Sequence, residues 1–457
     1  MTQQDLHECS PLLQAIYSQM DPCSPSQRLV VWPKNPLVGS SCDADYVSNA
    51  HDSDSLLIDP EKIPGYEQQM SLLEKNNLLE NGCDHRVKVI TAKLNGDLAK
   101  WNADLSVNQE VVHTLEDFQS LKALWERFDV DPMNGFDWNH SWWKAFQDSG
   151  DLHLMTFERD GEVVGIAPFF VDRWMKLKRF RFLASGNVCS DYVDIICDPE
   201  HYELCVHQLA KYIEAMNFDI VELDCTKGNR LAQVLQQHLD QRFQCDQREA
   251  EPTWRLNLPE SWKEFVSGTK KSLRRKINKS IRRIDSGEVT MSSTSEGLDV
   301  DSAFEILKDL HTLRFNSMDK PGVFADDRFT EFLQSAVTEF CRQGKGEIVV
   351  ASREGKPFAA HLYFESKEGF QFYQGGADPE AMKLEPGHLV FTWMVKRALE
   401  RGDRVFDFLR GNEPYKKFWG ASTVPQWKTR LVSKRILPTM VYKAIKLGRR
   451  FRGSDDA

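Results

Sequence analysis

The amino-acid sequence predicts a mixed α/β (α+β) protein in which two units of one fold follow an N-terminal extension. From about residue 111 onward, segments with the two-residue period of strands alternate with segments of helical period. After residue 250, the same order of elements occurs a second time. The first 110 residues keep neither period for long. With 457 residues, the chain has room for about three domains.

Residues 1–110 are acidic and interrupted by polar clusters. They contain 16 acids and 8 bases, which gives a net charge of −8. Because acidic segments with few apolar residues rarely bury a core, we expect a poorly ordered extension with at most a short helix or two. A small divergent subdomain is the alternative.

The first globular unit is expected at residues 111–250. Helices are predicted near 115–128, 138–146 and 202–216 by apolar residues at helical spacing. Asp160-Gly161 is a typical two-residue hairpin turn between strands at 152–157 and 163–170. Further strands are predicted at 180–183, 192–196 and 219–223.

The second unit is expected at residues 251–435, with the same succession of helices, hairpin, strand, helix and strand. Helices are predicted at 262–284, 303–313 and 329–342, and one begins at Pro386-Gly387 and ends near 400. Strands are predicted at 347–353, 357–364, 370–374 and 405–409, with a hairpin turn at Glu354-Gly355. We interpret the shared order as two copies of one fold in tandem.

The overall composition excludes several classes of protein. The 58 Lys and Arg and 68 Asp and Glu residues give a net charge of −10, which argues against DNA binding over a large surface. No apolar run approaches the roughly 18 residues of a membrane span, and the N-terminus does not resemble a signal peptide. The ten cysteines form no C-x-x-C pair, so we expect reduced thiols, a cytoplasmic location and no metal.

The predicted helix at 262–284 is strongly basic. Residues 263–283 contain nine bases and one acid, Glu264, while four apolar residues share one face. Phosphate is the natural ligand for such a surface, because guanidinium groups bind it with paired hydrogen bonds. We therefore take Lys271, Arg274 and Arg275 as candidate anion-binding residues. A solvated face neutralised by the acidic extension is the alternative.

The tail at residues 436–457 is also basic. Between residues 434 and 452 there are seven Lys or Arg and no acid, and five apolar residues can share one face. Such a segment could lie on an anionic membrane surface, at the inner face of the membrane. The alternative, a solvated helix packed on the preceding domain, is favoured.

Two segments of the second unit place polar groups where a ligand would bind. A strand with Gln371 and Tyr373 leads into a loop, and the next helix begins at Pro386, Gly387, His388 and Leu389. The backbone N–H groups at such a helix start attract anions. At the end of the last predicted strand, five ionisable residues gather close to one another, where α/β sheets bind ligands. They are Asp407, Arg410, Glu413, Tyr415 and Lys416. A structural ion-pair corner is the alternative for this group.

His361 lies within an apolar strand. Its ordinary pKa is near neutrality, which suits a group that accepts a proton from an amine. A lone histidine in such a strand is more often a hydrogen-bonded core residue, and both interpretations stay open.

These segments together resemble the CelD/BcsL-type acyltransferases of the GNAT superfamily, which are related to the FemAB aminoacyltransferases. The resemblance covers about residues 111–435. In the first unit it rests on Phe136, residues 141–146, 161–168, 181–183 and 191–194. In the second unit it rests on residues 271–276, 375–379, Pro386-Gly387, 407–416 and Trp419-Gly420. The stretch 407–416 is the longest and most specific of these.

The resemblance implies two tandem GNAT-like domains, with the donor bound by the second. It implies transfer of an acetyl or other acyl group from acyl-CoA to an amine or hydroxyl of a small-molecule or glycan acceptor. The setting would be exopolysaccharide, cellulose or cell-envelope biosynthesis. It assigns acid–base or positioning roles to Asp407, Arg410, Glu413, Tyr415 and Lys416. The strand from Gln371 to Gln374 would hold the thioester carbonyl through its backbone N–H groups.

One departure from the family pattern affects the donor. GNAT enzymes usually carry a loop with several glycines for the CoA pyrophosphate, whereas residues 383–389 contain only Gly387. FemAB relatives instead take the acyl group from aminoacyl-tRNA, which the basic helix would permit. A binding module without chemistry, for a phosphorylated glycan or lipid carrier, is a further alternative. The sequence leaves the oligomeric state open.

Overall fold

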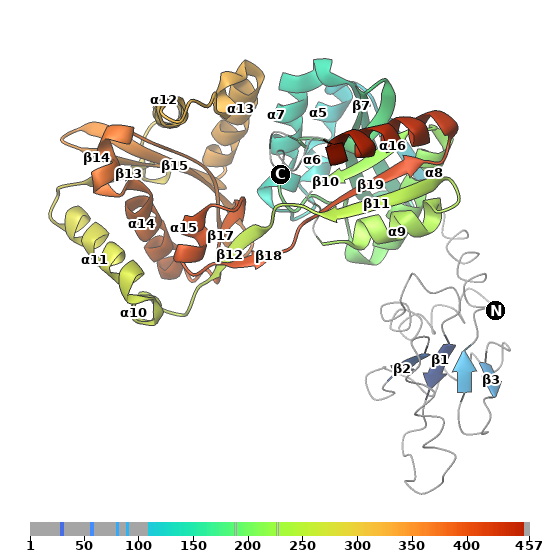
Figure 1. Cartoon of the computed structure of the whole chain (residues 1–457), viewed down its shortest axis with the longest axis horizontal. Coiled ribbons are helices and arrows are strands. Elements are labelled where there is room, and N and C mark those ends of the chain that lie inside the picture. The colour runs from blue at the N-terminus through green and yellow to red at the C-terminus, as the bar shows by residue number, and fades with distance from the viewer. Residues whose placement is uncertain are drawn as a thin grey trace, which may run out of the picture. The chain divides into compact units, whose positions relative to one another are not determined.

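The structure is a computed structural model of the whole chain (Figure 1). It describes residues 108–451, apart from 187, 189, 225 and 227, together with four short strands between residues 28 and 90. The chain forms two units, Met1–Ser106 and Val107–Ala457.

In the first unit, the described residues form a four-stranded sheet in the order β2-β1-β4-β3. The strands are β1 (Arg28–Val31), β2 (Ser55–Ile58), β3 (Leu79–Asn81) and β4 (Lys88–Ile90). None of them was predicted from the sequence. The expected lack of order in the rest of this extension lies outside the described residues.

The second unit has two halves, each with a mixed sheet. The first sheet has the order β11-β19-β10-β8-β7-β6-β5, with β9 beside β7. Its strands are β5 (Asn108–Val112), β6 (Asp151–Arg159), β7 (Glu162–Trp174), β8 (Leu177–Phe182), β9 (Ile196–Cys197), β10 (Ile220–Asp224), β11 (Phe243–Glu249) and β19 (Trp427–Ser433). Because β5 belongs to this sheet, the first half begins at residue 108 and not at 111.

The three helices predicted in the first half are found in place, but the one expected at 115–128 is divided into two, and one helix is additional. They are α5 (Leu115–Ser120), α6 (Lys122–Trp125), α7 (Phe136–Phe146), α8 (Tyr202–Ala215) and the unpredicted α9 (Arg230–Leu239). The hairpin turn at Asp160-Gly161 is confirmed, since both residues have the positive φ (55° and 82°) that such a turn requires.

The second sheet has the order β13-β14-β15-β16-β17-β12-β18. Its strands are β12 (Thr253–Asn257), β13 (Thr290–Ser293), β14 (Gly346–Arg353), β15 (Lys356–Ser366), β16 (Gly369–Ala377), β17 (Val405–Arg410) and β18 (Ser422–Val424). The helices of this half are α10 (Trp262–Gly268), α11 (Lys271–Asp285), α12 (Val300–Asn316), α13 (Asp327–Arg342), α14 (Pro386–Arg401) and α15 (Pro414–Phe418). The predicted helix start at Pro386 is confirmed.

The single helix predicted at 262–284 is wrong, because the chain breaks at Thr269 and Lys270. Both residues have extended backbone, with ψ of 154° and 147°. Arg274 holds the break: its guanidinium donates to the carbonyls of Val266, Ser267 and Thr269 at the end of α10.

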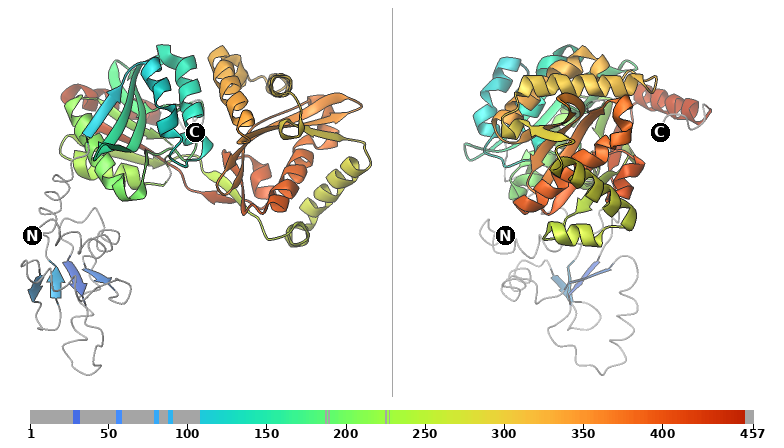
Figure 2. Two further views of the ribbon diagram at one scale, coloured as in Figure 1. Left: turned by 180° about the vertical axis from the view of Figure 1, so that it is seen from behind. Right: turned by 90° about the vertical axis from the view of Figure 1, so that its left-hand side faces the viewer.

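The two halves share one hydrophobic core. Trp138 on α7 packs its ring against Phe332, Phe364 and Tyr373 of the second half, with ring centroids 4.7–5.4 Å apart. Figure 2 shows α7 and α13 side by side where the halves meet. Burying a large aromatic ring in this way stabilises the folded chain by several kcal/mol, and it fixes how the two halves pack on each other.

The chain crosses between the halves twice, which corrects the predicted boundary at residue 435. After β18, the chain returns to the first sheet, where β19 lies between β10 and β11 and is antiparallel to both. The last helix, α16 (Ile436–Phe451), follows β19 and packs on the first half (Figure 1). Among the described helices, none is long and apolar enough to cross a membrane.

Candidate functional site

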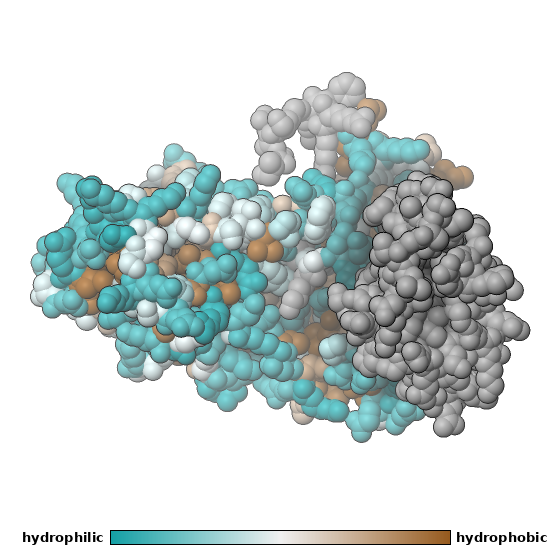
Figure 3. Space-filling model, turned by 90° about the horizontal axis from the view of Figure 1, so that it is seen from below, coloured by the Kyte–Doolittle hydropathy of each residue, from teal (hydrophilic) through white to brown (hydrophobic). Residues whose placement is uncertain are grey.

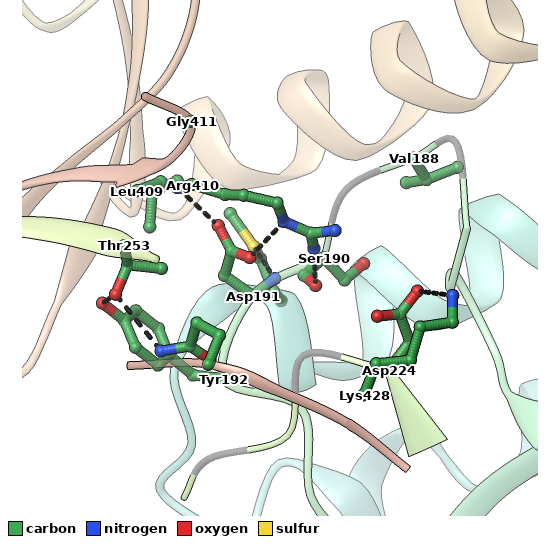
Figure 4. A network of polar contacts seen from close by, with 12 residues as sticks. Val188, Ser190, Asp191, Tyr192, Asp224, Thr253, Leu409, Arg410, Gly411 and Lys428 are labelled. Atoms are coloured by element: carbon green, nitrogen blue, oxygen red, sulfur yellow. Dashed lines mark hydrogen bonds and ion pairs between the residues drawn. The ribbon is translucent and has the colours of Figure 1, made fainter. Parts of the chain in front are cut away.

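The end of β17 meets a loop of the first half, and polar side chains from both halves bind each other there (Figure 4). Asp407 and Arg410 come from β17, and Ser190, Asp191 and Tyr192 come from the loop after β8. The alternation of Phe406, Asp407 and Phe408 that the sequence showed turns Asp407 away from the aromatic core and toward this loop.

Asp407 is buried and fully engaged. Its Oδ2 lies 2.7 Å from the Tyr192 hydroxyl, and its Oδ1 accepts a 2.7 Å hydrogen bond from the backbone N–H of Leu409. Arg255 Nε lies 3.6 Å from Oδ2. Burial raises the pKa of Asp407 to about 6, and these hydrogen bonds limit the rise because they favour the charged form. Asp407 is therefore a carboxyl group that can exchange a proton near neutral pH.

Tyr192 links the two halves. Its hydroxyl lies 2.7 Å from both Asp407 Oδ2 and Thr253 Oγ1 on β12, while its carbonyl accepts from Asn134 Nδ2 at 2.9 Å. Its backbone has a positive φ of 59°, which aims the ring at β17. Burial and the neighbouring charge of Asp407 raise the pKa of Tyr192, so the hydroxyl keeps its proton. The sequence did not single out Tyr192, although it lies in a segment on which the family resemblance rests.

Arg410 binds the loop of the first half. Its Nε donates to Asp191 Oδ1 at 2.8 Å, its backbone N–H donates to Asp191 Oδ2 at 3.0 Å, and Nη2 donates to the carbonyl of Ser190 at 2.7 Å. Asp191 is 2% exposed. Burial raises the pKa of Asp191, while the guanidinium of Arg410 opposes this shift.

The other predicted residues after β17 form a capped strand end. Lys416 is buried, and its Nζ donates to the carbonyls of Leu409, Arg410 and Gly411 at 3.2, 2.6 and 3.3 Å. It also pairs with Glu413 at 3.0 Å, and burial lowers its pKa. The structural ion-pair corner that was the alternative for this segment thus describes Lys416, Glu413 and Arg410 well.

His361 and Tyr415 lie in the aromatic core around α14. His361 Nδ1 lies 2.9 Å from the Tyr363 hydroxyl, and burial lowers the pKa of this ring to about 3. The imidazole is therefore neutral near pH 7 and a poor proton acceptor. The ring of Tyr415 stacks on Phe391 at 5.4 Å, and burial raises its pKa.

Gln371 and Tyr373 lie on β16, beside β17. The two strands are parallel and share one paired position, Gln371 with Asp407. The Oε1 atom of Gln371 is buried and has no hydrogen-bond partner among the described residues. A bulge at Tyr373 interrupts the pairing with β15, and the Tyr373 hydroxyl donates to the carbonyl of Val188 at 2.6 Å. Gln371 thus lies beside Asp407, whereas Tyr373 binds the first half.

The start of α14 lies beside the basic helix α11. Pro386, Gly387, His388 and Leu389 form its first turn, as predicted. Just before it, the Glu385 carboxylate pairs with Lys276 and Lys279, the latter at 3.1 Å. An acid of the same chain therefore neutralises two of the bases. His388 is also engaged, since its Nδ1 accepts from Trp419 Nε1 at 3.2 Å.

Among the candidate anion-binding residues of α11, only two stay exposed. Arg274 is used at the end of α10, whereas Lys271 and Arg275 point to solvent. Figure 3 shows a largely hydrophilic surface over the second half on the face that it draws. The described residues contain no group of three or more His, Cys, Asp or Glu side chains placed to hold a metal ion.

Part of the second half is similar to a known family of domains. Residues 270–417 match the Acetyltransf_6 family, an acetyltransferase (GNAT) domain. The search of curated proteins found no match. The matched segment covers α11 to α15 and includes Asp407 and the start of α14.

Three solved structures are similar to this chain over most of its length. FemX has a TM-score of 0.51 and 14% identity, over 74% of this chain and 99% of that chain. The C-terminal domain of an Agrobacterium fabrum protein named a lysylphosphatidylglycerol synthetase has a TM-score of 0.45 and 10% identity, over 73% and 97%. A tandem GNAT protein from the clavulanic acid biosynthesis pathway has a TM-score of 0.39 and 10% identity, over 71% and 98%. The chain thus has a tandem GNAT-like fold, and residues 270–417 are similar to GNAT acetyltransferase domains.

Proposed function

We propose that this protein is a GNAT-type acyltransferase that moves an acetyl or other acyl group from acyl-CoA to an amine or hydroxyl. The acceptor would be a small molecule or glycan, in exopolysaccharide, cellulose or cell-envelope biosynthesis, as for the CelD/BcsL-type enzymes. One observation carries the proposal. A buried carboxyl with a pKa near 6, Asp407, meets a tyrosine of the other half inside a domain that matches a GNAT acetyltransferase.

The chemistry needs a group that takes one proton. The acceptor's nitrogen or oxygen attacks the thioester carbonyl, its bond to carbon forms, the C–S bond breaks, and the CoA thiolate leaves. The acceptor's proton passes to Tyr192, whose own proton moves to Asp407, so the tyrosine is restored in the same step. The Tyr192 hydroxyl is half-buried and contacts the buried Asp407 carboxylate. It can therefore pass a proton from a substrate to Asp407, which the substrate does not reach directly.

The donor would lie along β16, with its phosphates at the start of α14. The first turn of a 16-residue helix offers backbone N–H groups and the positive end of the helix dipole. Lys276 and Lys279 lie beside this helix start, where both pair with the Glu385 carboxylate. A donor phosphate could replace that carboxylate as their partner. Gly387 leaves room, since a methyl group added there would meet only Phe391, at 4.0 Å.

Calorimetry with acetyl-CoA tests the donor site. We expect the wild-type protein and a Gly387→Ala variant to bind alike, and a Gly387→Glu variant to lose binding. A carboxylate in the first turn of a helix favours folding, so the loss would report charge repulsion of the donor and not an unfolded protein. Equal binding by all three proteins would refute this location.

A FemAB-like transfer from aminoacyl-tRNA is the second candidate. It is favoured by the exposed bases Lys271 and Arg275, for which no acid of the chain provides an ion pair within the described residues. Salt-sensitive binding of aminoacyl-tRNA, lost in a Lys271→Glu, Arg275→Glu variant, together with no binding of acetyl-CoA or longer acyl-CoAs, would support it.

A binding module without chemistry remains the rival from another class. Its strongest support is that Arg410 is used to hold the halves together and that Lys416 is used to bind the carbonyls at the end of β17. Release of CoA in the presence of a pool of amine and glycan acceptors, lost in an Asp407→Asn variant, would exclude it. Donor binding with no release by the wild type would favour it.

A further inference from the structure

The last helix, α16, carries an apolar stripe on its outer side. Ile436, Leu437, Met440 and Leu447 are 80%, 65%, 64% and 54% exposed. They are four of the nine large apolar side chains that are exposed among the described residues. At about 100° per residue, all four fall within an arc of about 100°. Scattered exposed apolar residues need no explanation, but a stripe along one helix does.

The inner side of α16 fixes the direction of this stripe. Tyr442 is buried and packs with Leu177, Ile220 and Val432 of the first sheet. Its hydroxyl donates to Asp246 on β11. The helix is therefore seated on the domain by one face, and the stripe points outward. In Figure 2 (right), α16 lies at the margin of the second unit, and no other described helix or strand of that unit covers its outer side.

The charge around the stripe has one sign. From Ile436 to Phe451 the chain has four bases and no acid, within a protein whose net charge is −10. Lys443 lies beside the stripe and is exposed, with no acid partner among the described residues. On the inner side of the helix, the bases are compensated: acids of the chain pair with Lys428, Arg430 and Lys446 around a pocket of about 220 Å³.

We propose that α16 docks this protein on the surface of an anionic lipid bilayer. The stripe would enter the boundary between headgroups and acyl chains, and the bases beside it would lie among the lipid phosphates. A helix that is apolar on one side and basic beside it, without a spanning length, is suited to lie in the plane of the membrane. Because the protein as a whole carries a net charge of −10, an anionic membrane would favour a basic surface such as this one over the acidic ones.

Binding to vesicles by co-sedimentation tests the proposal, with the full chain. We expect binding to vesicles of phosphatidylglycerol and phosphatidylcholine in equal amounts, weakening as salt is raised, and little binding to phosphatidylcholine alone. A Leu437→Ser, Met440→Ser variant should bind at least about tenfold more weakly, because both side chains leave the bilayer. Neither residue is in the core, so the fold should be kept.

The matched control is Leu313→Ser, Met318→Ser, which removes two apolar side chains of similar exposure, 47% and 45%, from the region of α12. It should bind like the wild type. No binding of the wild type to anionic vesicles, or equal binding of both pairs of variants, would overturn the proposal. A dimer in solution that only the α16 variant dissociates, without vesicle binding, would assign the stripe to a second copy and would also overturn it.

Discussion

Replacing Asp407 by asparagine should make the protein more stable at neutral pH while it removes activity. The pKa of Asp407 is about 6 in the folded chain and about 3.9 for an aspartate in an unfolded chain. The folded chain therefore binds more protons between pH 4 and 6, so its free energy of unfolding falls as pH rises through this window. At about 1.4 kcal/mol per unit, the fall amounts to at most about 3 kcal/mol.

Asparagine has the shape of the protonated carboxyl, but it does not ionise. The variant therefore does not lose stability as the pH rises. The Asp407→Asn variant should unfold with nearly the same free energy as the wild type at pH 4. It should be up to about 3 kcal/mol more stable at pH 7.5, as measured by urea denaturation at both pH values. An Asp309→Asn variant, changed on an exposed position of α12, controls for the loss of one carboxyl.

The activity of the same variant completes the test. If Asp407 is the proton acceptor, kcat/KM of the wild type should fall below pH 6 with a slope of one, and the variant should lose most of its turnover at every pH. The reasoning is refuted if Asp407→Asn is less stable than the wild type by the same amount at pH 4 and pH 7.5. That result would mean that Asp407 is ionised at both pH values and that burial does not raise its pKa.

Three further changes test neighbouring contacts. Tyr192→Phe removes a hydrogen bond to the ionised form of Asp407, so the acid limb of the pH–rate profile should move upward by about one unit and turnover should fall; an unchanged profile would show that the hydroxyl has no part in proton transfer. Arg410→Met leaves Asp191 buried without its ion pair, and the free energy of unfolding at pH 7.5 should drop by about 3–5 kcal/mol, with a smaller loss at pH 5, where a protonated carboxyl needs no partner; urea denaturation at both pH values decides this. Gly376→Ala would place a methyl group 2.3 Å from the backbone of α12, so we expect a loss of about 1–3 kcal/mol and a lower Tm, whereas a Tm equal to that of the wild type would mean that α12 yields easily.

Local sequence signals predicted local structure well. Asp160-Gly161 and Glu354-Gly355 take the positive φ that a hairpin turn demands, and Pro386 begins a helix because proline lacks the N–H that the first turn does not need. The break at Thr269 was missed because the apolar spacing continues across it, and the bonds of Arg274 that hold it connect residues five to eight apart.

Contacts between distant segments could not be predicted in the same way. Asp407 and Arg410 were recognised as important residues, but their partners Tyr192 and Asp191 lie more than 200 residues earlier. The sequence also does not reveal whether an ionisable group is covered. From the sequence, His361 could be either a proton acceptor or a core residue. Only its burial, which lowers its pKa, distinguishes these two roles.

The return of β19 to the first sheet has a consequence for how the protein is made. The strand sits between β10 and β11, so both of these must wait for it before their hydrogen bonds are complete. On a ribosome adding about 5–20 residues per second, the roughly 180 residues between β11 and β19 take about ten to forty seconds to appear. During that interval the first half exposes two unpaired strand edges. The nascent chain would depend on a chaperone or on slow collapse to prevent these edges from pairing with other chains.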